Sequence, residues 1–387
     1  MSQTKVEAPF VENNRPFRNL IINGDMQVAQ RATSTTGVAN DSDEGYNSLD
    51  RFGLYYYGNE GGAATMSQDT TVPSDTSYGV QKQSLKVDVT TADTSIGATG
   101  IIALKQTVEA QYIHHSGWDF TSSSSKITLS FWARSVKAGT YCVLFRDHDA
   151  SGERYFVKEY TLVANTWKHV EMVVPGDSNL VFNADNGEGL EVRWILAAGD
   201  DRNDATADTW FAPGSAYENS TSNQVNFYDS TSNNFFLTGV QLEVGDQATN
   251  FEHLPRDVQL DRCMRYCYVH NNDADSSQAL IFPGASRGGT NKYFYIQHPR
   301  PMRDTPSVTV SGEIRIINCT AGDQADADDT LAIGGVTPSI QGQNANEKGV
   351  TIAYTGAVSG ITDTANTGYM MMFIKETDNK LTFDAEL

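Results

Sequence analysis

Short runs of β-branched and aromatic residues recur along most of the chain, separated by clusters of Gly, Asn, Asp and Ser. Up to residue 250 they are RFGLYYY (51–57), SLKVDV (84–89), IIALKQTV (101–108), ITLSFWAR (127–134), TYCVLFR (140–146), RYFVKEY (154–160), WKHVEMVV (167–174), EVRWILA (191–197) and FFLTGVQL (235–242). Runs of this length and composition are typical of strands, and the clusters between them are typical of turns. The pattern predicts an antiparallel β protein.

The run at 127–134 alternates strictly between apolar and more polar residues. Ile127, Leu129, Phe131 and Ala133 fall on one face, and Thr128, Ser130, Trp132 and Arg134 fall on the other. Because successive side chains of a strand point to opposite faces, one face goes to a core and the other carries polar groups around an exposed Trp132. This pattern favours a two-sheet sandwich, with the strand-poor stretch 198–234 as loops at its rim.

One segment has helical rather than strand periodicity. In LPRDVQLDRCMRYCYV (254–269) an apolar stripe recurs at helical spacing, formed by Leu260, Cys263, Met264, Cys267 and Tyr268. Pro255 suits a first helical position. We expect this helix to connect two β domains, because further strand-like runs follow between 278 and 387. The fold class predicted is all-β, a jelly-roll β-sandwich followed by a short connecting α-helix and a second smaller β-sandwich domain.

The charge balance excludes some classes of partner. The chain has 48 acidic and 28 basic side chains and a formal net charge of -20, which repels a nucleic-acid backbone. No apolar run approaches the ~18 residues of a membrane span, and the first residues lack the apolar core of a signal peptide. We therefore expect no nucleic-acid partner, no membrane insertion and synthesis in a cytoplasm.

Motifs for metal binding or catalysis are weak. DHDASGE (147–153) matches the first positions of a calcium loop, but Lys158 replaces the final carboxylate, so a hairpin turn is favoured. The pair His114 and His115 is interpreted as a surface pair, and Cys263 and Cys267 as buried thiols. No catalytic motif is present, so we predict a non-enzyme, although 48 acids leave a glycosidase carboxylate pair open.

Aromatic residues next to polar sequence suggest sugar binding. A pyranose ring stacks its C–H face on an exposed aromatic ring, while amides and carboxylates bind its hydroxyls. Three consecutive tyrosines at 55–57 must expose at least one ring if they form a strand. The predicted glycan-binding residues are Tyr56, Trp118, Trp132, Trp210 and Tyr228. The alternative for each ring is packing in the core or at the rim.

Residues 19–250 resemble the jelly-roll carbohydrate-binding modules attached to glycoside hydrolases. The resemblance lies in NLIINGDM, ITLSFWARSVKAGTYCVLFRD, NTWKHVEMVVPGD and FFLTGVQLEVGD. It implies that residues 20–22 form the first strand, followed by a turn or bulge at 23–25. It also implies a possible structural calcium ion near Asn23, Asp25 and Glu243, where the first and last strands of such modules meet.

A second resemblance covers nearly the whole chain. NLIINGDMQVAQR, LDRF (49–52), FFLTGVQLEVGDQATNFEHLPRDVQLDRCMRYCYV (235–269), HPRPMRDTPSVTV (298–310) and FDAEL (383–387) occur in the order seen in bacteriophage tail-fibre-type virion proteins. The resemblance implies a surface-displayed homotrimer that contacts host glycans. The alternatives are a head fibre or decoration protein with a purely structural role, and a glycan depolymerase.

These observations divide the chain into four segments. Residues 1–18 form an extended arm that attaches to other virion proteins, and 19–253 form the jelly-roll domain. Residues 254–269 form the connecting helix, and 270–387 form the C-terminal β domain. The expected location is the virion surface, as a tail or head appendage, with host cell-surface polysaccharide as the external partner.

Overall fold

The computed structural model divides the chain into two compact units. They are residues 1–260, to which Leu387 is assigned, and residues 261–386. The structure describes residues 17–39, 45–58, 61–214, 218–271, 281–286, 291–311, 314–318, 331–333, 339–340, 346–355, 368–373 and 380–387. Most of the predicted arm at 1–18, and Cys319, lie outside the described residues.

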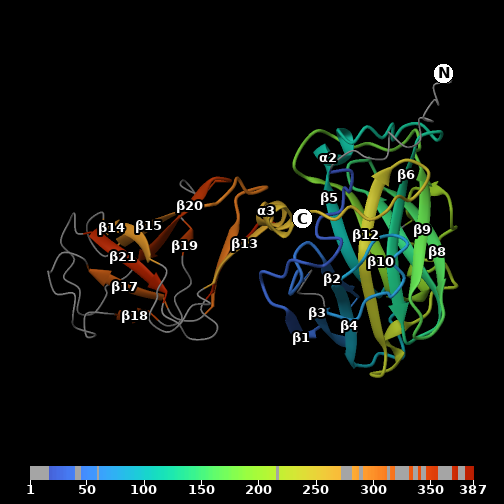
Figure 1. Ribbon diagram of the computed structural model, residues 1–387, viewed down its shortest axis with the longest axis horizontal. Helices are drawn as coiled ribbons and strands as arrows, with labels where there is room; N and C mark the ends of the chain where they lie inside the picture. The colour runs from blue at the N-terminus through green and yellow to red at the C-terminus, as the bar shows by residue number, and fades with distance from the viewer. Residues whose placement is uncertain are drawn as a thin grey trace, which may run out of the picture. The chain divides into compact units, whose positions relative to one another are not determined.

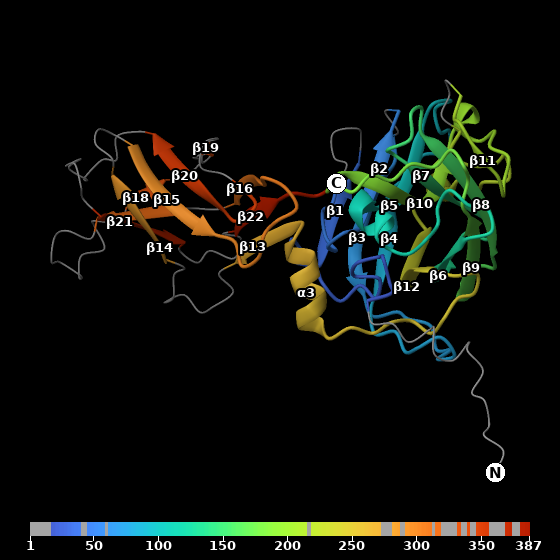
Figure 2. The same cartoon turned by 90° about the horizontal axis from the view of Figure 1, so that it is seen from above.

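The first unit is an antiparallel β-sandwich of two six-stranded sheets. Sheet A has the order β1 (Ser34–Val38), β3 (Ala63–Asp69), β4 (Ser84–Thr91), β12 (Asn234–Val244), β6 (Lys126–Ser135) and β9 (Lys168–Pro175). Sheet B has the order β11 (Trp210–Phe211), β8 (Arg154–Leu162), β7 (Gly139–Asp147), β10 (Glu188–Ala198), β5 (Ile101–Glu109) and β2 (Gly53–Tyr57). Figure 1 shows the strands from the side, and Figure 2 separates the two layers.

The core lies between the two sheets and follows from the alternation of the strands. In β6 the side chains of Leu129, Phe131 and Ala133 point inward, and in β10 those of Val192 and Trp194 meet them from the other sheet. Burial of such side chains stabilises a fold by roughly 1.5–3 kcal/mol each, which makes this core the main source of stability of the first unit. The predicted strands at 51–57, 84–89, 101–108, 127–134, 140–146, 154–160, 167–174, 191–197 and 235–242 are confirmed.

The helices among the described residues are short. They are α2 (Ala110–His114), the 3-10 turns η1 (Asp200–Arg202) and η2 (Phe227–Asp229), and α3 (Arg256–Met264). None of the helices that the structure describes is long and apolar enough to cross a membrane.

The second unit is also built from antiparallel strands. A three-stranded sheet has the order β13 (Cys267–Asn271), β22 (Lys380–Asp384) and β16 (Ser307–Ser311). A seven-stranded sheet has the order β18 (Leu331–Ile333), β17 (Ile314–Asn318), β21 (Gly368–Phe373), β14 (Ile281–Ser286), β15 (Asn291–Gln297), β20 (Gly349–Thr355) and β19 (Ser339–Ile340). The predicted all-β fold class, with a sandwich followed by a helix and a second β domain, is confirmed.

Two local predictions are wrong. Residues 20–22 do not form a first strand. The Leu20 N–H donates one backbone hydrogen bond to the Leu242 carbonyl at 2.9 Å, and beside it the Asn19 side chain pairs with β12: its Oδ1 accepts from the Leu242 N–H at 3.0 Å, and its Nδ2 donates to the Val240 carbonyl at 3.0 Å. The helix predicted at 254–269 ends at Met264, and its last residues form β13, whose backbone pairs with β22.

Candidate functional site

Four of the five predicted glycan-binding rings are buried. The prediction requires exposed rings, and the expected exposure is wrong for these four. Tyr56, Trp118, Trp132 and Tyr228 are at most 4% exposed. Trp210 is half-buried at the sheet edge, where its Nε1 donates to the Pro175 carbonyl at 2.7 Å. The five residues therefore do not form one exposed surface to which a glycan could bind.

The buried tyrosines form one contact inside the core. The hydroxyls of Tyr56 and Tyr228 lie 2.8 Å apart, and the rings meet edge to face at a centroid distance of 5.9 Å. Burial raises the pKa of both hydroxyls, because it penalises the phenolate. The prediction that the tyrosine run at 55–57 exposes a ring is confirmed, but the exposed ring is that of Tyr57, since Leu54 and Tyr56 face the core.

Trp132 does lie on the solvent side of its sheet, as predicted, but other rings cover it. It belongs to a set on the outer face of sheet A that we call the aromatic strip: Tyr78, Trp132, Trp167, His169 and Phe236. The strand register explains the set, since Trp132 pairs with His169 on β9 and with Thr238 on β12, two residues from Phe236. Tyr78 comes from the connection between β3 and β4.

The rings at the Tyr78 end of the strip are in close contact. The Tyr78 and His169 rings are stacked, with centroids 3.5 Å apart and planes 13° apart. The Trp132 ring lies 5.1 Å from His169 and 6.2 Å from Tyr78. The backbone carbonyl of Tyr78 also accepts from the Phe251 N–H at 3.0 Å. Tyr78 is thus a partly exposed ring held by a ring on one side and by its backbone.

Hydrogen-bonding groups without partners lie next to this ring cluster. Gln81 is 2% exposed, and neither its Nε2 nor its Oε1 has a hydrogen-bond partner among the described residues; the same holds for Nε1 of Trp132. Gly239, at φ +60°, lets these groups approach, since a Cβ there would lie 3.1 Å from Gln81 Nε2 and 3.2 Å from Trp132 Cδ1. An unmet buried polar group costs roughly 1–3 kcal/mol.

A nearby acid and burial keep the two stacked rings neutral. The hydrogen bond between the Tyr78 hydroxyl and the Glu171 carboxylate raises the pKa of Tyr78. Burial lowers the pKa of His169, although Glu171 and Asp75 oppose that shift. At neutral pH the stack therefore consists of a neutral imidazole and a neutral phenol.

The other end of the strip carries cations. The Trp167 ring lies 6.0 Å from the Phe236 ring. The guanidinium carbon of Arg134 lies 5.1 Å from the Phe236 centroid, and Nζ of Lys86 lies 6.0 Å from it. The strip thus ends in acids near Tyr78 and in bases near Phe236.

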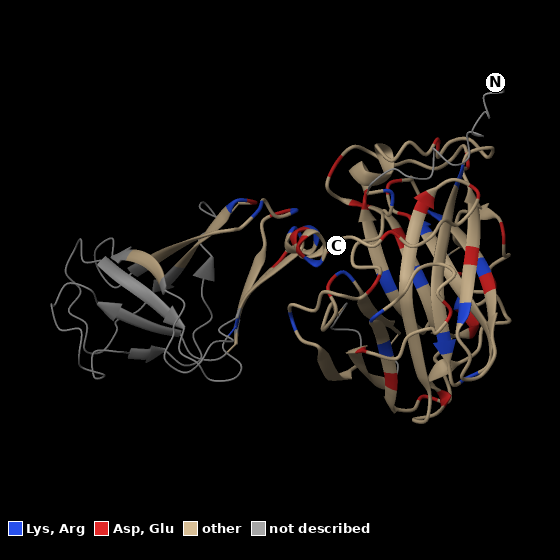
Figure 3. Cartoon of the chain, viewed as in Figure 1, with Lys and Arg blue, Asp and Glu red and all other residues tan. Residues whose placement is uncertain are grey.

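A second cluster lies on the outer face of sheet B, around Glu191. This carboxylate accepts from Arg193, lies 2.8 Å from Nε2 of His148 and pairs with Arg146 at 3.3 Å. Burial alone would raise the pKa of Glu191, but Arg193 and His148 overcome it and hold the pKa well below its usual range. Figure 3 shows acidic and basic residues interspersed along the strands of the first unit. Since these charges satisfy one another, we interpret the cluster as a structural ion network.

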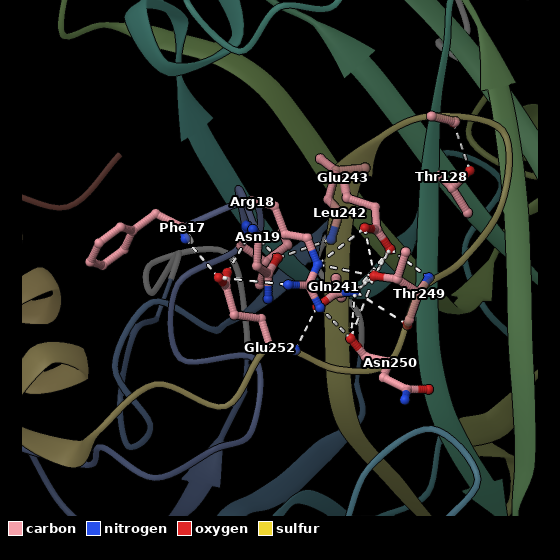
Figure 4. A network of polar contacts seen from close by, with 12 residues as sticks. Phe17, Arg18, Asn19, Thr128, Gln241, Leu242, Glu243, Thr249, Asn250 and Glu252 are labelled. Atoms are coloured by element: carbon pink, nitrogen blue, oxygen red, sulfur yellow. Dashed lines mark hydrogen bonds and ion pairs between the residues drawn. The ribbon is translucent and has the colours of Figure 1, made fainter. Parts of the chain in front are cut away.

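The predicted calcium site does not fit the residues present. Both oxygens of Glu243 face donors, including the Thr249 N–H at 2.8 Å and Nε of Arg18 at 3.4 Å (Figure 4). Asn23 Oδ1 accepts from the Val28 N–H at 2.9 Å. Asp25 alone keeps one oxygen without a partner, whereas calcium takes 6–8 oxygen ligands. Among the described residues no group of three or more His, Cys, Asp or Glu could hold a metal ion.

The remaining motif predictions have clear outcomes. Residues 147–153 form the turn of the β7–β8 hairpin, as expected, and Asp147 accepts from the N–H groups of Asp149 and Val181 at 2.9 Å each. His114 and His115 are both exposed, which confirms a surface pair. Cys263 and Cys267 are buried and form no disulfide among the described residues, also as predicted.

Part of the aromatic strip had a signal in the sequence. The alternation of WKHVEMVV puts Trp167 and His169 on the face opposite to Val170 and Met172, so both could have been assigned to the outer face. Tyr78 lies in the loop-like stretch SYGVQKQ, which has no periodicity. Its stacking on His169 comes from the tertiary fold alone.

No protein-family model matches the chain, and no curated protein matches it. Solved structures give distant similarities. One is the enzymatically active domain of tailspike protein 4 of bacteriophage CBA120, with 12% identity and a TM-score of 0.31, covering 60% of this chain and 22% of that one. Another is a CBM4 structure, with 13% identity and a TM-score of 0.31, covering 58% of this chain and 98% of that one.

A third is the N-terminal cellulose-binding domain of β-1,4-glucanase C from Cellulomonas fimi, with 13% identity and a TM-score of 0.26, covering 56% of this chain and 97% of that one. The chain therefore spans less than a quarter of the tailspike structure but nearly all of the two others. TM-scores this low assign neither a family nor a function to the chain.

Proposed function

We propose that the chain is a bacteriophage virion surface protein of the tail-fibre or spike type, and that its first unit binds host-surface glycans through the aromatic strip. The virion role is supported by the order of the five sequence segments that resemble tail-fibre-type proteins. In this proposal the protein is a homotrimer on the virion surface, and the segment 1–18 attaches it to other virion proteins.

One observation carries the glycan-binding part of the proposal. Tyr78 is a partly exposed ring held against His169, and the amide of Gln81 and Nε1 of Trp132 lie nearby without partners among the described residues. A sugar offers an apolar C–H face to a ring and hydroxyls to amide and indole groups. Tyr78 offers the ring face at the surface, its hydroxyl and the Glu171 carboxylate offer polar contacts beside it, and the Gln81 and Trp132 groups lie behind the ring.

The enzymatic alternative needs a carboxylic acid that can give up a proton. Retaining and inverting glycosidases both depend on such a group, with a raised pKa. Glu191 is the most buried carboxylate of the sheet B cluster, and its lowered pKa keeps it ionised. Release of reducing ends from host polysaccharide by the purified chain would favour a depolymerase over a binding protein.

A glycan array probed with the full chain tests the proposal. Tyr78→Ala and Trp167→Ala each remove one ring of the strip. The matched control is Tyr112→Ala, which removes a 39% exposed tyrosine from α2, a helix that contacts β5 and β10 of the other sheet. We expect wild type and the control to bind the same glycans.

We expect each strip variant to bind about fivefold more weakly, because a ring contact of this kind is worth about 1 kcal/mol. A blank array for the wild-type chain would contradict glycan binding and favour a purely structural head or tail role. Equal binding by all four proteins would place the glycan site elsewhere.

A further inference from the structure

Arg134 is an arginine held in place by an asparagine, with no acidic partner among the residues that the structure describes. Its Nε donates to the Asn165 carbonyl and its Nη2 donates to the Asn165 Oδ1, each at 3.1 Å. Asn165 is itself fixed, with φ 59° and its N–H donating to the Ser135 carbonyl at 2.8 Å. The guanidinium therefore has a defined position above the Phe236 ring.

The absence of an acid beside Arg134 stands out in this chain, where acids outnumber bases by 48 to 28. Within the described part of the chain no carboxylate lies within ion-pair distance of Arg134, whereas the half-buried Arg146 pairs with both Glu153 and Glu191. A guanidinium carries N–H donors on both terminal nitrogens in a fork that matches a carboxylate. Asn165 occupies only one side of that fork.

The surroundings of Arg134 suit a ligand that combines an anion with a ring. Nζ of Lys86 lies 6.0 Å from the centroid of the same Phe236 ring and pairs with the partly exposed Asp88 at 3.1 Å. Trp167, next to Phe236, supplies a half-buried indole. Two cations and an indole thus gather at one end of the aromatic strip.

We propose that the Arg134 end of the aromatic strip binds an anionic group carried on a sugar ring, so that the glycan ligand is an acidic polysaccharide. The inference rests on the proposed function, because it names the ligand class of the same face. The sugar ring lies against Trp167, and its anionic group accepts from the free side of the Arg134 guanidinium, with Lys86 as a second cation.

Recognition of this ligand must come from short-range contacts. The chain carries a net charge of -20, which repels a polyanion at long range. At physiological salt, exposed charges more than about 8 Å apart are largely screened. Loss of the one charge-assisted contact at Arg134 therefore has a large effect, whereas loss of a distant positive charge has a small one.

Binding of the full chain to three polymers tests the inference: polygalacturonate, the same polymer with its carboxyl groups reduced, and dextran sulfate. The variant is Arg134→Gln. The control is Arg154→Gln, which makes the same change in net charge on β8 of the other sheet. Arg134→Lys keeps the charge and removes the fork.

We expect Arg134→Gln to bind the preferred acidic polymer at least about tenfold more weakly than wild type, and Arg154→Gln to match wild type. Arg134→Lys should fall between them. Binding of the reduced polymer should be the same in all four proteins. A preference for polygalacturonate would identify a carboxylate as the anionic group, and one for dextran sulfate would identify a sulfate-like group.

Equal losses in Arg134→Gln and Arg154→Gln, or no loss in either, would overturn the inference. If wild type binds neutral glycans through Trp167 and shows no preference for acidic ones, the acidic-ligand inference fails while the proposed function stands. If wild type binds none of the polymers and its glycan array is blank, both fail.

Discussion

His270 and His298 are imidazoles packed against aromatic rings in the second unit. The Phe383 ring lies 5.8 Å from His270 and 4.9 Å from His298. Neither ring nitrogen of His298 has a partner among the described residues. The pKa of each is lowered to about 4, by burial in both cases and, for His270, also by repulsion from a charged His298. Both are therefore neutral at pH 7.

We predict that the second unit loses stability in mild acid. A histidine of the unfolded chain has a pKa near 6.5, so the unfolded state binds more protons between about pH 6.5 and pH 4. The stability from the neutral pair is complete above about pH 6.5 and is lost as the pH falls toward 4. Thermal unfolding of the full chain at pH 7.5 and pH 5 measures this effect.

The variant His298→Phe is the matched comparison, since it keeps an aromatic ring and removes a titrating group. Its unfolding temperature should fall less between pH 7.5 and pH 5 than that of wild type. An identical fall in both proteins would show that His298 does not contribute to the acid sensitivity.

Side-chain direction could be predicted from the sequence only where the alternation is strict. The faces of β6 follow directly from ITLSFWAR, and Trp132 lies on the predicted side. In the run of three tyrosines the sequence has no alternation, and the choice of Tyr56 was wrong because Tyr56 shares the core face with Leu54. The exposed fraction of Trp132 depends on Tyr78, which is more than fifty residues away in the sequence.

At the level of elements, a polar network lies at the start of the first unit, next to the residues where the sequence predicts a strand. We call the network the clasp; it consists of Arg18, Asn19, Gln241, Glu243, Thr249 and Glu252 (Figure 4). The Glu252 carboxylate accepts from the N–H groups of Phe17 and Asn19 at 2.6 and 3.0 Å. The clasp joins residues 17–19 to the last strand of the sandwich and to the chain that follows it.

We predict that Asn19→Ala destabilises the first unit by about 3 kcal/mol. The change leaves the buried Leu242 N–H and Val240 carbonyl without their Asn19 partners, at a cost of roughly 1–3 kcal/mol each. Urea unfolding measures the effect. The control is Asn179→Ala, which removes an exposed amide that donates to the nearby Asp177 and should cost less than about 0.5 kcal/mol.

Asn19→Ala as stable as wild type would contradict the role given to the clasp. Because donors already occupy Glu243, we expect calcium to leave the unfolding midpoint of wild type and of Asn19→Ala unchanged. A midpoint that rises with calcium would restore the metal site implied by the sequence resemblance.

The sequence predicted the strands well and predicted two boundaries badly. The spacing of Cys267 and Tyr268 fits a helix, so the sequence predicts that the helix extends through them. In the fold these residues begin β13, which exchanges backbone hydrogen bonds with β22 more than 100 residues later. Such a distant partner overrides local periodicity. The opposite occurs at Asn19, where a side chain makes two of the hydrogen bonds to β12 beside the single backbone bond of Leu20.

On the scale of the whole molecule, the sequence predicted the all-β class and the order of sandwich, helix and second β domain. It could not predict the aromatic strip as a unit, because the strip combines one residue of the β3–β4 connection with residues in or next to three strands of sheet A, β6, β9 and β12. It also could not show that the charged residues on the outer face of sheet B form ion pairs with one another. Both depend on the strand order within each sheet.

The homotrimer implied by the tail-fibre resemblance is a separate prediction. Light scattering of the purified chain should give about three times the mass of one chain, 42.3 kDa. The mass should not change in Tyr78→Ala or Trp167→Ala, since both replace partly exposed rings. A mass of 42.3 kDa for wild type would contradict the trimer.

The central claim is that a glycan binds on the outer face of sheet A. The most direct measurement is a crystal or cryo-electron microscopy structure of the full chain with an oligosaccharide selected on the array. The account predicts a sugar ring in contact with Tyr78 or Trp167, and an anionic group beside Arg134. Density for the sugar over the Glu191 cluster of sheet B, or on the second unit, would contradict it.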